Sequence, residues 1–232
     1  MWGNDNNLSI FSEVGWLAKQ PAEFRDECLT QGRITSVRRG EAIYREGDEG
    51  LSIYGLQAGA VAVLIGPPRL APRIVDIIGP GSWFGVGPVL TGRRRSLEVR
   101  ALSDCTLLMV PGPVVEHWSS FRPEYARAIG ALAIIGHEVA SRVAAELLIP
   151  SSSRRIAAII MRIAAPESGE ARVDAKGILV TQAQLAEMAN VSRNVANGVL
   201  CRLRDAGWIE TSYGRVTVRD SAALAAHAYG ED

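Results

Sequence analysis

The sequence has few of the residues that build disulfide frameworks and metal centres. Its only cysteines are Cys28, Cys105 and Cys201, which are odd in number and widely separated. This spacing excludes a disulfide framework and any CxxC metal knot. The three histidines are equally scattered, so the sequence contains no HxH or HExxH ligand pair for zinc or iron. A metalloenzyme is therefore disfavoured, and no cofactor is predicted.

Net charge and long apolar runs are also lacking. The 232 residues hold 25 Lys and Arg against 25 Asp and Glu, so the whole chain shows no basic surplus for nucleic acid. No apolar run approaches the ~20 residues of a membrane span. Residues 1–7 lack the basic start and apolar core of a signal peptide. We therefore expect a cytoplasmic protein without membrane contact, with enough apolar residues for two domain cores.

Short β-prone runs separated by glycine-rich turns occupy residues 31–110. Their nearly regular spacing, without intervening helices, favours a jelly roll or sandwich over a parallel sheet. Two short helices interrupted at Pro21 are expected before them. A jelly roll can be a catalytic cupin, a sugar-binding module or a nucleotide sensor, and the missing histidine set removes most cupin enzymes. The expected strands are RITSV, AIY, SIYGLQ, AVAVLI, RIVDII, RSLEVRA and CTLLMV.

A long apolar helix is predicted over residues 123–148. A helix this apolar would be exposed on a monomer, and pairing with its own copy as a parallel coiled coil would cover it. The alternative is that the helix is a core element of the roll. Apolar side chains recur every three or four residues, and the predicted dimer seam is Ile129, Leu132, Ile135, Val139 and Val143.

A helix, a tight turn and a second helix are predicted after residue 180. Thr181 with Gln184 three residues later forms a capping box that starts the first helix. Asn190 tolerates the left-handed backbone of the turn. Ser192 can then cap the second helix, whose inward apolar positions are expected to be Val195, Val199, Leu200 and Leu203.

The second helix carries polar side chains that suit base recognition. Arg193, Asn194 and Asn197 point outward, and Arg pairs with guanine while Asn pairs with adenine. Two short strands follow, Trp208–Thr211 and Arg215–Val218, around an expected three-residue loop that ends in glycine. This hairpin is the wing of a winged helix-turn-helix and places Arg215 for a phosphate. Within residues 181–219, arginines outnumber Asp and Glu by only two. This is a small positive surplus for nucleic-acid binding, although a dimer doubles it.

The predicted fold is α+β in three parts. Residues 1–121 form the β jelly roll sensor domain, residues 122–150 the dimerisation helix, and residues 151–232 the winged helix-turn-helix domain. A hinge is expected near Ser151–Ser153, followed by a helix over residues 154–164. Residues 166–177 are expected to form a loop or hairpin, and residues 220–232 an Ala-rich tail without clear role.

This order of parts resembles the Crp–Fnr family of bacterial transcription regulators over about residues 11–219. The stretches that carry the resemblance are GDEGLSIYGLQAGAVAVLI, GSWFGVGPVLTGRRRSLEVRA, SRRI after the hinge, and VTQAQLAEMANVSRNVANGVLCRL. The resemblance implies a homodimer that binds an inverted-repeat operator in double-stranded DNA and contacts RNA polymerase.

For an effector, the resemblance implies a site in the roll. Arg95 and Ser96 match the pair that holds the cyclic phosphate, and Gly85 matches a ribose-site glycine, but Val86 replaces the ribose glutamate. Ser141 matches one of two adenine-contacting hydroxyl residues, and alanine stands at the other. The resemblance thus disfavours cyclic AMP. Another anionic effector, no effector at all, and a merely solvated turn at Arg95 and Ser96 remain open.

For DNA, the resemblance gives Thr181, Ser192 and Arg215 as phosphate contacts. Gln182 replaces a basic contact, and Asn194 replaces the family's base-reading glutamate, so we expect a different half-site. Two other classes of function remain as alternatives: a small-molecule sensor or binding module without DNA binding, and an enzyme on the roll, which lacks a catalytic constellation.

Overall fold

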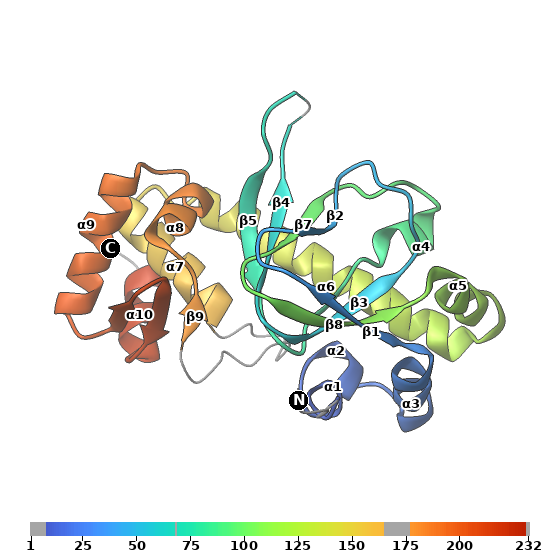
Figure 1. The fold of residues 1–232 in the computed structure, drawn as a ribbon. Helices are drawn as coiled ribbons and strands as arrows, with labels where there is room; N and C mark the ends of the chain where they lie inside the picture. The colour runs from blue at the N-terminus through green and yellow to red at the C-terminus, as the bar shows by residue number, and fades with distance from the viewer. Residues whose placement is uncertain (1–7, 68, 165–176, 231–232) are drawn as a thin grey trace, which may run out of the picture.

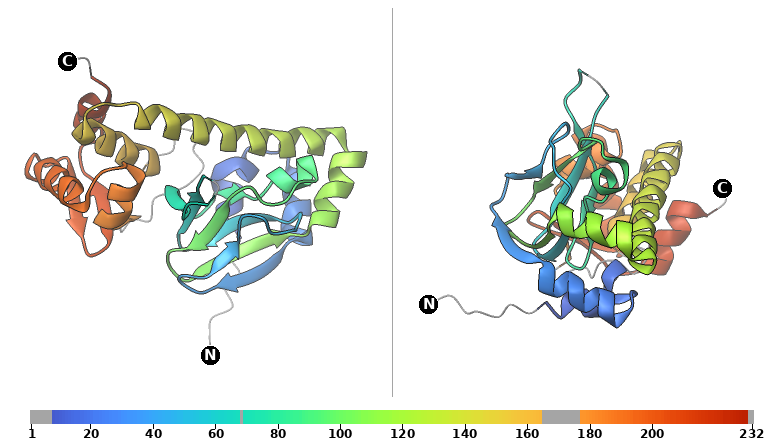
Figure 2. Two further views of the ribbon diagram at one scale, coloured as in Figure 1. Left: turned by 90° about the horizontal axis from the view of Figure 1, so that it is seen from above. Right: turned by 90° about the vertical axis from the view of Figure 1, so that its right-hand side faces the viewer.

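The computed structural model describes residues 8–67, 69–164 and 177–230. Figure 1 shows a β-sheet domain and a smaller, mainly helical C-terminal domain, with one long helix running between them. The helix lies along one side of both domains when the molecule is seen from above (Figure 2). This is the predicted α+β fold.

The N-terminal segment forms three short helices where two were expected. The break at Pro21 is confirmed, and a further break falls at Val14, whose backbone is extended. Phe11, Trp16 and Phe24 are fully buried against the roll, and the Trp16 indole Nε1 donates to the Ala128 carbonyl at 2.8 Å. The helices therefore tie the roll to the long helix. They are α1 (Ile10–Glu13), α2 (Gly15–Ala18) and α3 (Ala22–Gln31).

The roll consists of two four-stranded antiparallel sheets, ordered β1-β8-β3-β6 and β2-β7-β4-β5. Each of the seven runs expected to form strands contains one. The sequence did not reveal β6 (Trp83–Phe84) because two residues show no alternation, and the helix α4 (Gly87–Thr91) was not expected either. The other strands are β1 (Arg33–Val37), β2 (Ala42–Tyr44), β3 (Ile53–Ala58), β4 (Val61–Ile65), β5 (Arg73–Ile78), β7 (Glu98–Ala101) and β8 (Cys105–Val110).

The predicted long helix is α6 (Pro123–Leu147), and an unexpected helix, α5 (Gly112–Phe121), precedes it. By length and composition α6 could cross a membrane, and only 17% of its apolar window is buried. The sequence expectation concerned uninterrupted apolar runs, and Arg127, Glu138 and Arg142 interrupt those of α6. Ile129 and Leu132 are 0% and 3% exposed in the core of their own roll, so their predicted place in a seam between chains is corrected.

The C-terminal domain contains the predicted helix-turn-helix and wing. Its first helix begins at Ser152, two residues earlier than expected. Ser212 pairs with Arg215, so the wing loop has two residues, not three. The expected loop or hairpin over residues 166–177 lies outside the described residues, apart from Gly177. The elements are α7 (Ser152–Ala164), β9 (Ile178–Leu179), α8 (Gln182–Met188), α9 (Arg193–Asp205), β10 (Ile209–Ser212) and β11 (Arg215–Val218).

The expected tail is instead a helix, α10 (Ser221–Tyr229), that completes the domain core. Asp220 caps it by accepting from the Ala223 backbone N–H at 2.9 Å. Leu224 and Ala228 are buried in the cluster that contains α7 and α9. Its alanine-rich sequence has no clear apolar stripe, which is why periodicity did not predict it.

Candidate nucleic-acid interface and effector site

The turn between α8 and α9 is fixed by side-chain caps. The Gln184 backbone N–H donates to Thr181 Oγ1 at 3.2 Å, and the Thr181 N–H donates to Gln184 Oε1 at 2.8 Å. Asn190 has a φ of 51°, in the left-handed region. Ser192 Oγ accepts from the Val195 N–H at 3.3 Å. The capping box, the turn residue and the second cap are therefore confirmed, and they hold the start of α9 at the surface.

The start of α9 presents its polar side chains to solvent. The inward stripe is Ala196, Val199, Leu200 and Leu203, which are all buried. Val195 was expected there, but it lies one position off this stripe and is 42% exposed, next to the polar residues. Apolar side chains are the groups that contact thymine methyls in protein–DNA interfaces. The exposed residues predicted to contact DNA are Thr181, Gln182, Ser192, Arg193, Asn194 and Asn197.

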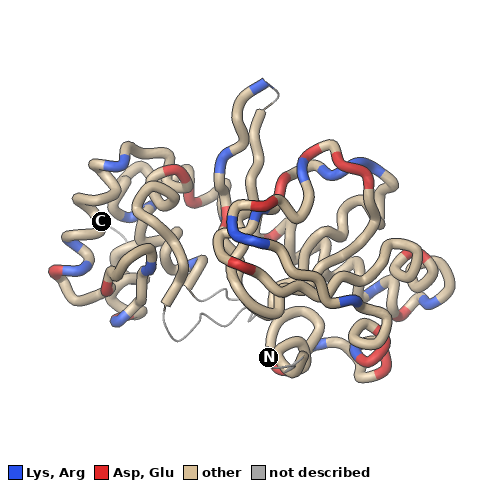
Figure 3. Tube along the Cα trace, viewed as in Figure 1, with Lys and Arg blue, Asp and Glu red and all other residues tan. Residues whose placement is uncertain are grey.

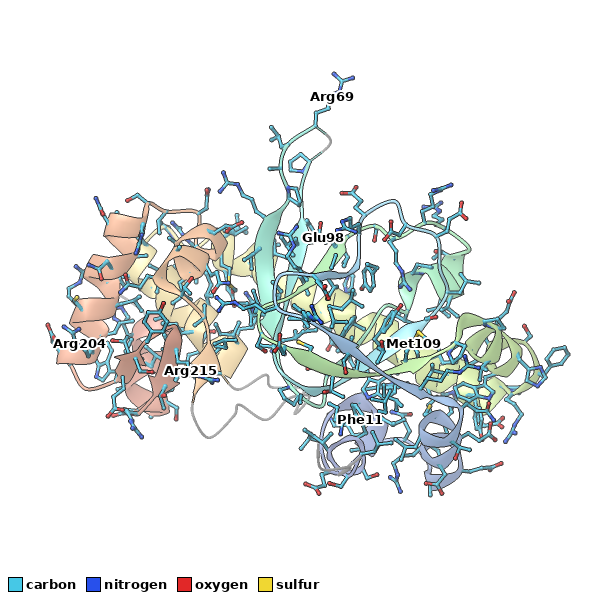
Figure 4. The ribbon with its side chains drawn as sticks, in the orientation of Figure 1. Phe11, Arg69, Glu98, Met109, Arg204 and Arg215 are labelled. Atoms are coloured by element: carbon cyan, nitrogen blue, oxygen red, sulfur yellow. The ribbon has the colours of Figure 1, made fainter. Side chains whose placement is uncertain are left out.

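The wing is held to the rest of the domain by its second strand. β11 pairs with β10 on one side and with β9 on the other, an arrangement the sequence did not predict. Arg215 is half-buried, and its Nη1 donates to the Gly177 carbonyl at 2.8 Å. Figure 4 shows Arg215 low on this domain and Arg204 at the outer end of α9. Tyr213 at the wing tip is fully exposed.

Charge on this domain is mixed. Arg204 pairs with Asp205 at 3.0 Å, and Arg219 pairs with Glu210 at 2.5 Å. The charges of these two arginines are partly neutralised, whereas Arg193 lies at the exposed start of α9. Figure 3 shows acidic and basic residues interspersed over both domains. Base contacts rather than bulk charge must therefore supply much of any DNA preference.

In the roll, Arg95 is a buried side chain that contacts two backbone carbonyls and an aromatic ring. It is 4% exposed, and its guanidinium donates to the carbonyls of Gly85 at 2.5 Å and Ser52 at 2.7 Å. The guanidinium carbon also lies 4.2 Å from the centre of the Tyr44 ring. Burial raises the pKa of Tyr44, and the nearby Arg95 charge opposes this only in part. The alternative of a solvated turn is therefore wrong for Arg95.

The remaining effector-site residues are only partly brought together. Gly85 has a φ of 93° and no room for a Cβ, which would lie 3.0 Å from Arg95 Nη1. Val86 follows it and is buried, so an apolar side chain fills this position. Ser96 is exposed, and Ser141 is exposed on α6. The structure thus joins Gly85 and Arg95 in one site, whereas Ser96 and Ser141 face solvent.

A β-roll with a buried arginine, followed by a long helix and a winged helix-turn-helix, has the architecture of a sensor domain linked to a DNA-binding domain. Comparison with known families agrees with this class. The cyclic nucleotide-binding domain family matches residues 34–118, and the Crp-like helix-turn-helix domain family matches residues 154–227. The chain belongs to the Crp–Fnr family and is a Crp-like transcription regulator with these two domains.

Individual relatives match over most of the chain. A CRP-like cAMP-activated global transcriptional regulator of Mycobacterium tuberculosis is 23% identical over 82% of this chain and 85% of its own length. The cyclic AMP receptor protein of Thermus thermophilus is 25% identical over 83% of this chain and 86% of its own length. The solved structure of FixK2 from Bradyrhizobium japonicum has a TM-score of 0.72 at 18% identity, covering 83% of this chain and 95% of that chain.

Proposed function

We propose that this regulator binds an inverted-repeat DNA site as a homodimer and does not depend on cyclic AMP. The observation that carries the DNA part is the exposed start of α9, where Arg193, Asn194 and Asn197 lie in a helix-turn-helix whose two helices both begin at side-chain caps. A twofold dimer requires two half-sites about one helical turn apart, ~34–36 Å. Contact with RNA polymerase in the cytoplasm completes the proposal.

The dimer proposal rests on an exposed strip along α6 and its C-cap Leu148, with large apolar side chains at both ends. Ile134 is 59% exposed and Leu148 is 81% exposed, which is costly for side chains of this size. Between them the helix carries small residues that let a second helix approach. We define the outer strip as the exposed residues that follow three-four spacing, typical of a coiled-coil seam: Ile134, His137, Ser141, Ala144 and Leu148.

This strip replaces part of the seam expected from the sequence. Ile135, Val139 and Val143 are half-buried at its border, so they can still contribute to the seam, whereas Ile129 and Leu132 belong to the roll core. A second copy of α6 could cover the outer strip without any other protein. It would also cover apolar surface of α6, of whose most apolar window only 17% is buried within one chain.

The effector proposal rests on Val86 and Arg95. The names of the relatives from Mycobacterium tuberculosis and Thermus thermophilus both refer to cyclic AMP. Here Val86 offers no acceptor for a ribose hydroxyl, and a buried hydroxyl without a partner costs on the order of 1–3 kcal/mol. The Arg95 guanidinium already donates to two backbone carbonyls, so only its remaining N–H donors are available to a phosphate. Another anionic effector, or none, fits this site better than cyclic AMP does.

Selection from a random-sequence DNA library, with and without cyclic AMP, tests both parts. We expect the same inverted-repeat motif to be enriched in both conditions. No enriched motif in either condition would favour a sensor module without DNA binding. A motif that appears only with cyclic AMP, together with low-micromolar binding by calorimetry that Arg95→Ala abolishes, would overturn the effector part.

A further inference from the structure

The DNA-binding domain packs against the open edge of the sensor sheet. β5 is the edge strand of its sheet, and its Ile74 backbone N–H donates to Glu187 Oε1 of α8 at 2.8 Å. Ile77 is buried in the same cluster as α7 and α9, and Ile74 and Leu102 pack against that cluster. Figure 1 shows β5 facing α7 and α8. The junction between the domains is thus a packed interface that covers an otherwise unpaired strand edge.

A buried ionic group lies at this junction and joins three parts of the chain. The Arg162 Nε of α7 donates to both carboxylate oxygens of Glu146 near the end of α6, at 2.9 and 3.0 Å. Its Nη1 donates to Asp76 of β5, and its Nη2 donates to the Val75 carbonyl at 3.2 Å. All three charged side chains are buried. One guanidinium therefore contacts the sensor domain and the connecting helix together.

The charges of this group are unbalanced and poorly solvated. Burial raises the pKa of Asp76 and of Glu146, although the positive charge of Arg162 opposes this for both. Burial alone would lower the pKa of Arg162, but Asp76 and Glu146 outweigh it and raise that pKa. Such groups add little net stability, yet losing one partner is costly because a buried charge stays unpaired. They therefore favour one arrangement over others of similar packing.

We propose that Arg162 is a positioning residue that fixes the orientation of the helix-turn-helix domain relative to the sensor domain and α6. Arg162 is buried at the junction, so it acts through β5 and α6 and does not touch DNA. This role rests on the proposed function. In a homodimer, the same contact in each chain sets the separation and rotation between the two copies of α9, the helices proposed to read bases.

This role predicts a specific dependence on half-site spacing. Adding one base pair between half-sites moves them apart by ~3.4 Å and rotates one about the DNA axis by roughly 35°, since ~10–10.5 base pairs make a turn. Two rigidly held reading helices should therefore prefer one spacing strongly. Loosening the junction should let them follow a shifted half-site, so the preference weakens while the half-site sequence stays the same.

The full-length protein with Arg162→Gln tests the role. Hydrogen–deuterium exchange of β5 needs no DNA, and we expect at least tenfold faster exchange of the Ile74 amide. Binding to inverted repeats with one base pair more or fewer measures spacing, and we expect the preference to fall at least threefold. Arg122→Gln is the matched control, because Arg122 also contacts several carboxylates but lies at the other end of α6. It should change neither readout.

The outcomes separate this proposal from the proposed function. Unchanged Ile74 exchange in Arg162→Gln would overturn the role of Arg162 whether or not the protein binds DNA. Faster exchange with an unchanged spacing preference would show a structural contact only, and would also overturn it. A wild type without any DNA motif refutes the proposed function and, with it, the positioning role. If Arg162→Gln does not fold, Asp76→Asn weakens the sensor contact alone and is judged by the same readouts.

Discussion

At the scale of single residues, the proposed reading of bases depends on three exposed side chains near the start of α9, Arg193, Asn194 and Asn197. Arg193→Ala should cost roughly 1–3 kcal/mol per half-site on the preferred operator and relax the choice at one guanine in each half-site, as for a two-bond arginine–guanine pair. Titrations on operators that vary this base pair measure the effect. Arg202→Ala, an exposed arginine two turns further along α9, is the control, and it should weaken all sequences alike. Equal loss on every sequence for Arg193→Ala would contradict base reading.

Val195 gives a second prediction at this scale, because an exposed apolar side chain among base-reading residues suits a thymine methyl group. Burying one methyl group contributes about 0.8 kcal/mol, or roughly a fourfold preference. Replacing one thymine per half-site with uracil removes two methyl contacts from the dimer, so it should weaken wild-type binding by roughly fifteenfold. Val195→Ala should bind both operators equally. Sensitivity to uracil that persists in the variant would show that the methyl contact lies elsewhere.

The same residues show what the sequence could and could not predict. The caps at Thr181 and Ser192 and the left-handed Asn190 follow from local chemistry, so the sequence predicted them correctly. Val195 fits a helical apolar repeat as well as Ala196 does, and hydrophobicity alone favoured the larger side chain. Arg95 was recognised by its motif, but its burial and its carbonyl partners come from segments far apart in the chain.

At the scale of elements, α6 was predicted almost to the residue, but the face it buries was not. Apolar spacing shows that a helix has an inward face, yet α6 has two apolar faces and the sequence does not rank them. The roll takes Ile129 and Leu132, which leaves the outer strip uncovered. The sequence did not predict β6 or α10 because neither has a clear apolar repeat. β6 has only two residues, and α10 is rich in alanine.

The two faces of α6 predict different consequences for assembly. Ile134→Asp should place a carboxylate in the seam between copies and yield folded monomers, because an unpaired charge there must lose its water. Leu132→Ala should instead destabilise the roll by about 2–5 kcal/mol and leave the dimer intact. Sedimentation velocity and thermal melting of both variants separate the two effects. A dimer that survives Ile134→Asp would contradict the outer strip as the interface.

At the scale of the whole molecule, the junction between the domains was beyond sequence reasoning. Asp76, Glu146 and Arg162 belong to three elements, and none forms part of a local motif. The pairing of β5 with the C-terminal domain depends on how two folded units pack. The sequence could predict both domains and their order, whereas their contact depends on long-range placement of a few buried charges.

The ionic group also predicts how stability depends on pH. Burial raises the carboxyl pKa values of Asp76 and Glu146 above their ordinary values of 3.8 and 4.5. Between the ordinary and the raised value, the folded protein binds more protons than the unfolded chain does. Stability therefore falls as pH rises through this window, and the contribution of each group is fully present only below its ordinary pKa.

Glu146→Gln removes one of these titrating groups while keeping an oxygen acceptor for Arg162. Relative to wild type, the variant should gain stability as pH rises above 4.5, by up to about 1.4 kcal/mol per pH unit until the raised pKa is passed. Chemical unfolding of both proteins at a series of pH values measures the difference. Glu124→Gln is the matched control, since the exposed Glu124 pairs with Arg122 and its pKa is lowered. Curves for wild type and Glu146→Gln that stay parallel at every pH would mean that Glu146 remains ionised in the folded protein, and that Arg162 compensates both carboxylates.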